Sequence, residues 1–208
     1  FERSDGHGPN PMIPAAPLKD LQQVARSHPA AHQAGEYMKE ISVLLADSLP
    51  LVEAEVARAT QVGRAPLAEA AAHLVMAGGK RVRPLTALLV DHVCGGDGRR
   101  IVPLAAAIEL IHSATLLHDD VMDEGEERRG RPASRVLWGN LVSVLAGDVV
   151  LTSALSLVQG AGIDGAIDDT LATMQALIAG EVAQLKARGR EDLGIEGYLE
   201  IARGKTAS

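Results

Sequence analysis

The segment IVPLAAAIELIHSATLLHDDVMDEG, residues 101–125, decides how this chain folds. Apolar residues recur three and four positions apart over Ile101–Val121, which predicts a long helix buried on more than one face. The helix ends in three carboxylates, those of Asp119, Asp120 and Asp123. Negative side chains at a helix C-terminus oppose the helix dipole by about 0.3–1 kcal/mol each. We therefore expect a positively charged partner near this end.

The same spacing of apolar residues occurs in further segments, and each of them is predicted to be a helix. These segments are Tyr37–Ala59, Leu67–Met76, Pro84–Cys94, Leu141–Val158, Ile167–Ala187 and Ile195–Ala202. The sustained alternation of apolar and polar residues that is typical of strands is not found. We predict an all-α bundle of about seven helices. Residues 17–208 are predicted to form one domain, preceded by a flexible segment at residues 1–16.

The composition of the chain bears on whether it binds nucleic acid. The chain has 208 residues, with 20 Lys and Arg against 27 Asp and Glu, a formal net charge of −7, and only 2% aromatic residues. Proteins that bind nucleic acid usually carry an excess of basic residues, and those that bind single strands also stack bases on aromatic side chains. Nucleic acid is therefore not expected as a partner.

Cysteine content and hydropathy bear on location. The single cysteine, Cys94, excludes an internal disulfide and a cysteine-rich zinc site, and it fits a reducing compartment. The first residues lack the basic start and apolar run of a secretory signal, so we predict a cytoplasmic protein. The longest apolar stretch, Val136–Val158, contains Asn140 and Asp148. Burial in a helical core explains it better than stable insertion in a membrane.

The carboxylates at the end of the central helix have the spacing of a metal site. Asp119 and Asp123, four positions apart, share one helix face, and Asp120 flanks them. Oxygen ligands held in this way suit Mg²⁺, which commonly binds one or two carboxylates together with substrate phosphates. A solvated acidic helix end is the alternative interpretation.

Arginines follow these carboxylates in the segment Arg128-Arg129-Gly130-Arg131-Pro132. Guanidinium groups bind phosphate through two parallel hydrogen bonds, so this segment is a candidate phosphate site. Alternatively, the arginines form surface ion pairs of small energy with Glu124, Glu126 and Glu127.

Two more cationic segments contain glycine. Gly78-Gly79-Lys80-Arg81-Val82-Arg83-Pro84 precedes a predicted helix, and Gly204-Lys205-Thr206 lies near the end of the sequence. Glycines let the backbone approach a ligand closely, and the start of a helix offers N–H groups to an anion. The spacing is not that of a P-loop, so nucleotide binding is not indicated. A helix-capping turn with solvated basic residues is the alternative.

Together, these motifs resemble those of the trans-isoprenyl diphosphate synthases, the polyprenyl synthase family. Asp119-Asp120-Val121-Met122-Asp123 with the arginines after it resembles the first aspartate-rich motif of the family. The Gly78–Pro84 segment resembles its homoallylic diphosphate motif, and Gly204-Lys205-Thr206 resembles its Lys-Thr element. The resemblance implies a helical bundle of the isoprenoid-synthase type, from a bacterial-type geranylgeranyl or longer-chain member.

The resemblance also implies an activity, head-to-tail condensation of isopentenyl diphosphate with an allylic diphosphate, and Mg²⁺ as cofactor. Asp119 and Asp123 would bind Mg²⁺, supported by Asp120. The residues implied to hold isopentenyl diphosphate are Lys80, Arg83, His112 and Arg129, and those implied to hold the allylic diphosphate are Arg128, Lys205 and Thr206. The residues implied to be catalytic are Asp119, Asp120, Asp123, Arg128 and Lys205.

Product length is predicted from the helix that carries the aspartates. Ala114 and Thr115 stand where short-chain members of the family carry bulky aromatics that block the tunnel for the growing chain. With a rise of about 5.4 Å per turn, roughly one isoprene unit per turn could descend past Thr115 and Ile111 to Ile108. We expect a product of C20 or longer.

The position of the last residue leaves open whether the chain is active by itself. A second aspartate-rich motif follows the Lys-Thr element in the family, whereas this sequence stops at Ser208. We therefore expect the C-terminal part of the fold to be missing, the 208-residue chain alone to be inactive, and the full polypeptide to be an active homodimer. The alternatives are a catalytically incompetent fragment, a non-catalytic subunit, or a terpene cyclase, which would not need the Gly79–Arg83 segment.

Overall fold

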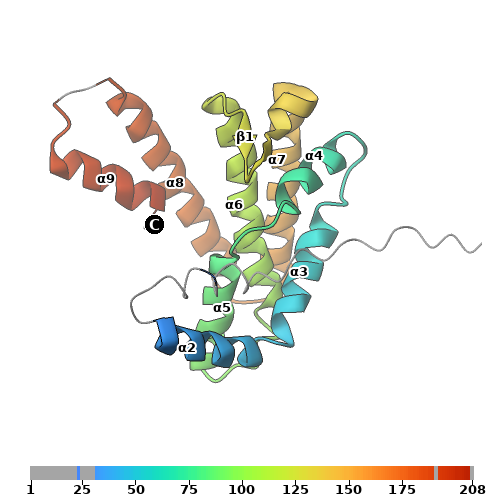
Figure 1. Cartoon of the computed structure of the whole chain (residues 1–208). Coiled ribbons are helices and arrows are strands. Elements are labelled where there is room, and N and C mark those ends of the chain that lie inside the picture. Colours follow the sequence, from blue (N-terminus) through green and yellow to red (C-terminus); the bar gives the residue numbers. More distant parts are fainter. Residues whose placement is uncertain (1–22, 24–30, 190–191, 207–208) are drawn as a thin grey trace, which may run out of the picture. The chain divides into compact units, whose positions relative to one another are not determined.

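The computed structural model describes residue 23, residues 31–189 and residues 192–206 (Figure 1). The predicted flexible segment at residues 1–16 lies outside the described residues. The chain consists of two compact units, Phe1–Ala161 and Gly162–Ser208. That residues 17–208 form a single domain therefore stays a prediction.

The all-helical fold is confirmed in the part of the chain that the structure describes. The helices of the first unit are α2 (Ala31–Leu44), α3 (Ser48–Ala59), α4 (Leu67–Val75), α5 (Val82–Val93), α6 (Val102–Met122) and α7 (Ser134–Gly160). Those of the second unit are α8 (Ala166–Ala187) and α9 (Ile195–Thr206). A short antiparallel hairpin, β1 (Glu127–Arg128) and β2 (Arg131–Pro132), joins α6 to α7. Strands of two residues are too brief to be recognised from alternation in the sequence.

One predicted helix is two helices in the structure. Tyr37–Ala59 was predicted as a single helix, but α2 ends at Leu44 and α3 begins at Ser48. Pro50 explains the break, because a proline inside a continuous helix lacks the N–H donor and its ring clashes with the carbonyl four residues earlier. In the first turn of α3 that donor is not needed.

The core of the first unit is built around α6, which packs against α3, α4, α5 and α7. Its fully buried residues are Ala105, Ala106, Ala107, Leu110, Ser113, Leu117 and Asp120. The buried residues of α7 include small ones, Ser143, Ala146, Gly147 and Ala154, so the two helices can approach closely. A Cβ atom at Gly147 would collide with Nε2 of His118, so a side chain there would displace the histidine ring.

In the second unit, α8 and α9 pack against each other where two glycines meet. A Cβ atom at Gly180 would lie 2.6 Å from the backbone nitrogen of Lys205 and 2.7 Å from the carbonyl carbon of Gly204. Only a residue without a side chain lets the two backbones come this close. The contact fixes where Lys205 lies along α8.

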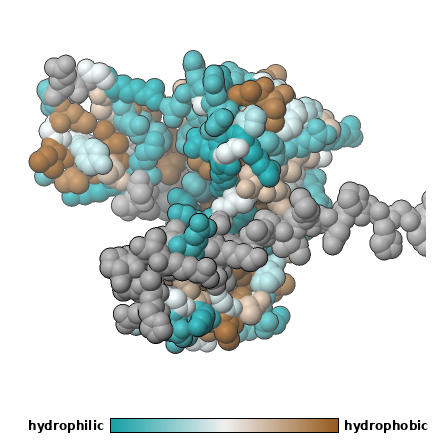
Figure 2. Space-filling view, in the orientation of Figure 1, coloured by the Kyte–Doolittle hydropathy of each residue, from teal (hydrophilic) through white to brown (hydrophobic). Residues whose placement is uncertain are grey.

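Hydrophobic side chains also reach the surface of both units (Figure 2). On α7, the exposed residues Leu137, Leu141 and Leu145 recur four positions apart. Among the described residues, α7 is the one helix long and apolar enough to cross a membrane. Of its most apolar stretch, 33% is buried inside the protein. Core helices of soluble proteins have the same composition. The absence of stable membrane insertion therefore stays a prediction.

Candidate functional site

The hairpin after α6 aims two neighbouring arginines in different directions. Glu127 pairs with Pro132, and Arg128 pairs with Arg131, which leaves Arg129 and Gly130 as a two-residue turn. Both turn residues have positive φ, 55° and 71°, as a type I′ turn requires. The sequence analysis predicted the arginine cluster but not this hairpin, which sets its geometry.

Arg128 points back to the end of α6 and binds Asp120. Its Nε and Nη2 atoms donate to Oδ1 of Asp120 at 2.9 Å and 2.5 Å. The Asp120 side chain is 1% exposed and that of Arg128 is 34% exposed. Asp120 Oδ2 is buried and has no hydrogen-bond partner. Asp120 therefore holds Arg128 at the base of the hairpin, while part of the guanidinium remains open to solvent.

Arg129 points the other way, toward the loop before α5. Its Nη1 donates to the carbonyl oxygens of Gly78 and, at 3.3 Å, Leu74, and its Nη2 lies 4.0 Å from Oε1 of Glu109. A Cβ atom at Gly79 would lie 3.3 Å from the guanidinium carbon, so a glycine there leaves room for Arg129. Gly78 and Gly79 thus contact Arg129 of the same chain.

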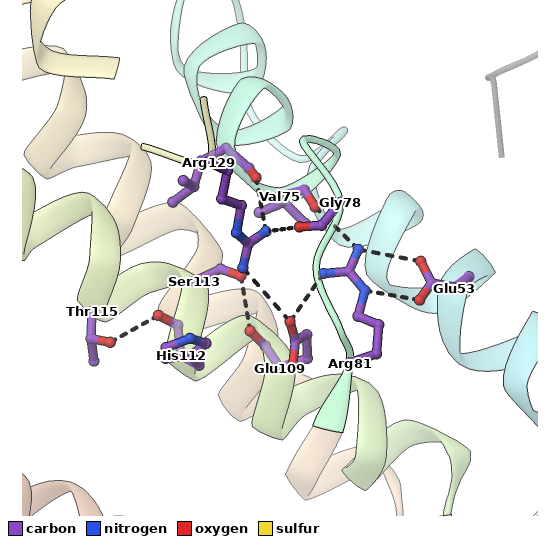
Figure 3. Close-up of polar contacts among 10 residues, drawn as sticks. Glu53, Val75, Gly78, Arg81, Glu109, His112, Ser113, Thr115 and Arg129 are labelled. Carbon is purple, nitrogen blue, oxygen red and sulfur yellow. Dashed lines mark hydrogen bonds and ion pairs between the residues drawn. The ribbon is translucent and has the colours of Figure 1, made fainter. Parts of the chain in front are cut away.

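A buried ionic cluster lies behind this contact (Figure 3). Arg81, 2% exposed, donates to both carboxylate oxygens of Glu53 at 2.9 Å and 3.3 Å and to Oε1 of Glu109 at 3.0 Å. Burial lowers the pKa of Arg81, but the hydrogen bonds and charges of Glu53 and Glu109 together raise it above its ordinary value. Sequence reasoning missed this cluster. The available signal was Glu109, a single acid within an otherwise apolar helical face.

Lys80 and Arg83, on either side of Arg81, are exposed. Arg83 stands in the first turn of α5, and its charge reaches His112 on α6. Burial, followed by the charges of Arg83, Arg129 and Arg128, lowers the pKa of His112 to about 4. The charges of Arg83, Arg128 and Arg129 therefore act together at His112, and they create a positive potential suited to an anion.

The lowered pKa of His112 predicts a loss of stability on acidification. An unfolded chain protonates histidine near pH 6.5, whereas folded His112 stays neutral down to about pH 4, so the unfolded state binds more protons in between. The stabilisation is fully present above pH 6.5 and declines as the pH falls toward 4. Urea unfolding at a series of pH values should show the wild type losing stability relative to His112→Asn across this window. A constant difference would contradict the environment described for His112.

Asp119 and Asp123 lie one turn apart at the end of α6, where the backbone N–H of Asp123 donates to the carbonyl of Asp119 at 2.8 Å. Asp123 is exposed and Asp119 is partly buried. Within the described ranges, no group of three or more His, Cys, Asp or Glu side chains could hold a metal ion by itself. Two accessible carboxylates do fit Mg²⁺ that is completed by substrate phosphates and water.

Lys205 belongs to the second unit. Its Nζ lies 2.6 Å from Oε1 of Glu181 and donates to Oε1 of Gln184 at 2.9 Å, so α8 holds its side chain. Thr206 ends α9, and its side chain lies outside the described residues. The implied roles of Lys205 and Thr206 in diphosphate binding stay predictions.

The four residues predicted to line the chain-length tunnel divide between two faces of α6. Ala114 is 1% exposed and lies in the core, whereas Thr115, Ile111 and Ile108 share a partly exposed face. A separate open cavity of about 520 Å³ lies between the ends of α3 and α7 near Pro103, and none of these four residues lines it. The tunnel assignment stays a prediction, with Thr115 and Ile111 better placed to carry it than Ala114.

Comparison with known proteins explains the convergence of these residues. The polyprenyl synthetase family model matches residues 64–208. The chain belongs to the polyprenyl synthetase family. A heptaprenyl diphosphate synthase component 2 from Geobacillus stearothermophilus is 39% identical over 82% of this chain and 53% of its own length. A geranylgeranyl diphosphate synthase from Saccharolobus solfataricus is 37% identical over 68% of this chain and 45% of its own length.

Solved polyprenyl synthases share the fold as well. A crystal structure of a Caulobacter crescentus polyprenyl synthase, complexed with calcium and isoprenyl diphosphate, superposes with a TM-score of 0.76 at 35% identity. The match covers 80% of this chain and 51% of that one. The predicted family and the isoprenoid-synthase type of helical fold are thereby confirmed. This polyprenyl synthetase chain spans about half the length of the curated relatives it matches.

Proposed function

We propose that the protein is a prenyltransferase that condenses isopentenyl diphosphate with an allylic diphosphate. The observation that carries the proposal is the hairpin after α6, which sets Arg128 against Asp120, between Asp119 and Asp123 in the sequence, and Arg129 against the loop before α5. The charges of both arginines and of Arg83 also act on His112 of α6. Cations gathered beside two accessible carboxylates suit a diphosphate and the divalent metal that accompanies it.

Each residue has a part in the proposed reaction. Arg129, Arg83 and Lys80 hold isopentenyl diphosphate, while Arg128 holds the allylic diphosphate. Asp119 and Asp123 would hold Mg²⁺, which supplies charge neutralisation for a departing diphosphate. The C–O bond of the allylic substrate breaks, the double bond of isopentenyl diphosphate attacks the allylic carbon, and a proton passes to the released diphosphate. The arginines stabilise the negative charge that develops on the leaving group.

We also propose a product of C20 or longer, because Thr115, on the partly exposed face of α6, is small where short-chain members of the family carry a bulky aromatic. Relatives of this protein are named for products as different as geranylgeranyl and heptaprenyl diphosphate, so family membership alone does not fix the length.

The tunnel residues give this proposal a test. Thr115→Phe is expected to shift the product distribution of the full polypeptide toward shorter chains, because the ring would enter the proposed tunnel below Asp119. Ala114→Phe, on the buried face, is expected also to lower stability by about 1–3 kcal/mol through overpacking. Thin-layer chromatography of the dephosphorylated products, together with thermal unfolding, separates the two effects. An unchanged product distribution with Thr115→Phe would remove the tunnel from this face.

The experiment that tests the function is chain elongation with radiolabelled isopentenyl diphosphate and C5, C10 or C15 allylic primers at saturating Mg²⁺. We expect the full gene product to elongate at least one primer. The 208-residue chain should bind diphosphate but turn over poorly. No elongation by the full product with any primer would overturn the enzymatic proposal.

A non-catalytic subunit is the second candidate, and the observation that favours it is a relative named as component 2 of a heptaprenyl diphosphate synthase. Elongation that appears only after a second polypeptide is added would support this candidate. We further propose a cytoplasmic homodimer, with the exposed leucines of α7 as a surface that a second copy could cover.

A further inference from the structure

We infer that Glu109 is a positioning residue that fixes the orientation of Arg129 for diphosphate binding, and that Arg81 keeps Glu109 from neutralising Arg129. The inference deepens the proposed function and rests on it. Glu109 lies on α6 one turn before His112, is 3% exposed, and is therefore shielded from any ligand in solvent.

The first step is the place of Glu109 between two arginines (Figure 3). One oxygen, Oε1, accepts a hydrogen bond from Nη1 of Arg81 at 3.0 Å and lies 4.0 Å from Nη2 of Arg129. Glu109 thus serves as the third point of attachment for Arg129, beside the two loop carbonyls of Leu74 and Gly78. Three fixed points hold a planar guanidinium in one orientation.

The second step concerns charge. Arg81 is shared between two carboxylates, those of Glu53 and Glu109, and both are buried with it. Oε1 of Glu109 lies 3.0 Å from Arg81 and 4.0 Å from Arg129, so its attraction to Arg129 is the weaker of the two. Burial and then the charge of Arg81 lower the pKa of Arg129, while Glu109 opposes both effects. Glu109 therefore stabilises the charged form of Arg129.

The third step concerns which arginine of the cluster is accessible to a ligand. Burial first, and then the charges of Arg83, Arg129 and Arg128, lower the pKa of His112. Arg81 itself, with a side chain 1% exposed, cannot reach a ligand. Of the two arginines in the buried cluster, Arg129, 20% exposed, is the one available to a diphosphate.

Two variants distinguish positioning from simple charge balance. Glu109→Gln removes the negative charge beside Arg129. If Glu109 only neutralised Arg129, this variant would bind an anion more tightly. If Glu109 positions Arg129, it will bind the anion more weakly. Glu109→Asp keeps the charge and the balance of the cluster but withdraws the carboxylate by one methylene. Positioning predicts that this variant also binds more weakly, by about fivefold, the loss expected when an ion pair worth about 1 kcal/mol is broken. Charge balance alone predicts wild-type affinity.

The readout is calorimetric binding of inorganic pyrophosphate to the 208-residue chain, with thermal unfolding to confirm that each variant is folded. Glu53→Gln is the matched control, because it removes a buried carboxylate from Arg81 but none from Arg129; its affinity should stay within about threefold of wild type. In the full polypeptide, Glu109→Asp should raise KM for isopentenyl diphosphate more than it lowers kcat.

Each outcome decides something. Unchanged or tighter binding by both Glu109 variants would overturn the positioning role. An equal loss in Glu53→Gln would overturn it too, because it would show a general effect of the buried cluster. Pyrophosphate binding that follows the expected pattern without elongation of any primer would count against the proposed function alone. A wild-type chain that does not bind pyrophosphate would overturn the positioning role alone, because elongation by the full polypeptide decides the proposed function.

Discussion

Arg81→Met is expected to lower the free energy of unfolding by about 3–5 kcal/mol, because it leaves two buried carboxylates without their cation. Glu53 is 8% exposed and Glu109 is 3% exposed, so water cannot replace the lost partner at either one. A loss of this size is comparable to much of the stability of an ordinary domain.

The reason lies in the difference between an exposed and a buried ion pair. Arg99 and Asp47 lie 4.0 Å apart with side chains 64% and 86% exposed, so Arg99→Met should change stability by less than about 0.5 kcal/mol. The two arginine variants carry the same change in charge and differ in burial. Urea unfolding followed by circular dichroism measures both.

A third variant separates ion pairing from packing. Replacing Arg81 by Met together with Glu53 and Glu109 by Leu removes every charge from the cluster at once. Such all-apolar replacements are often neutral or stabilising, so the triple variant should recover most of the loss. A single Arg81→Met variant as stable as the wild type would show that the cluster is hydrated in solution.

Asp119→Asn is expected to reduce elongation by the full polypeptide about 10²–10³-fold, as the loss of one group that stabilises the transition state typically does. Its fold should be unaffected, because the side chain is partly accessible at the end of α6. The concentration of Mg²⁺ required for half-maximal rate should rise, since one of the two carboxylates offered to the metal is lost.

The neighbouring residue should respond differently. Asp120→Asn replaces a buried carboxylate that holds Arg128 and is expected to lower stability by about 1–3 kcal/mol. Glu124→Gln, in the exposed turn after α6, is the control for removing one negative charge from this region. Steady-state rates over a range of Mg²⁺, measured beside thermal unfolding, check all three variants. If Asp119→Asn elongates at the wild-type rate, Asp119 is not a metal ligand.

Local sequence patterns predicted the helices well. The spacing of apolar residues placed the central helix at Ile101–Val121, and α6 spans Val102–Met122. Periodicity reflects contacts within a few residues, and it is strong where one face is buried. The break after Leu44 was missed because apolar spacing continues across it, and Pro50 was the signal to be weighed against it.

The ionic cluster could not be predicted from local patterns. Arg81 lies 28 positions from both Glu53 and Glu109 in the sequence, and no spacing rule connects residues so far apart. Lys80, Arg81 and Arg83 look alike in the sequence, yet the fold buries the middle one and exposes the other two. The packing of α3, α5 and α6 determines which of these three side chains is buried.

The turn at Arg129 and Gly130 begins directly after Arg128, so the two arginines that we propose to bind the two diphosphates are joined by a single peptide unit. Because Arg128 is anchored on α6 and Arg129 on the loop before α5, the hairpin acts as a spacer of fixed length between them. A change in its backbone would move both guanidinium groups together. A mutation in the hairpin would therefore move the two proposed substrate positions together. To move one without the other, evolution would have to change Asp120, which binds Arg128, or the loop before α5, which binds Arg129.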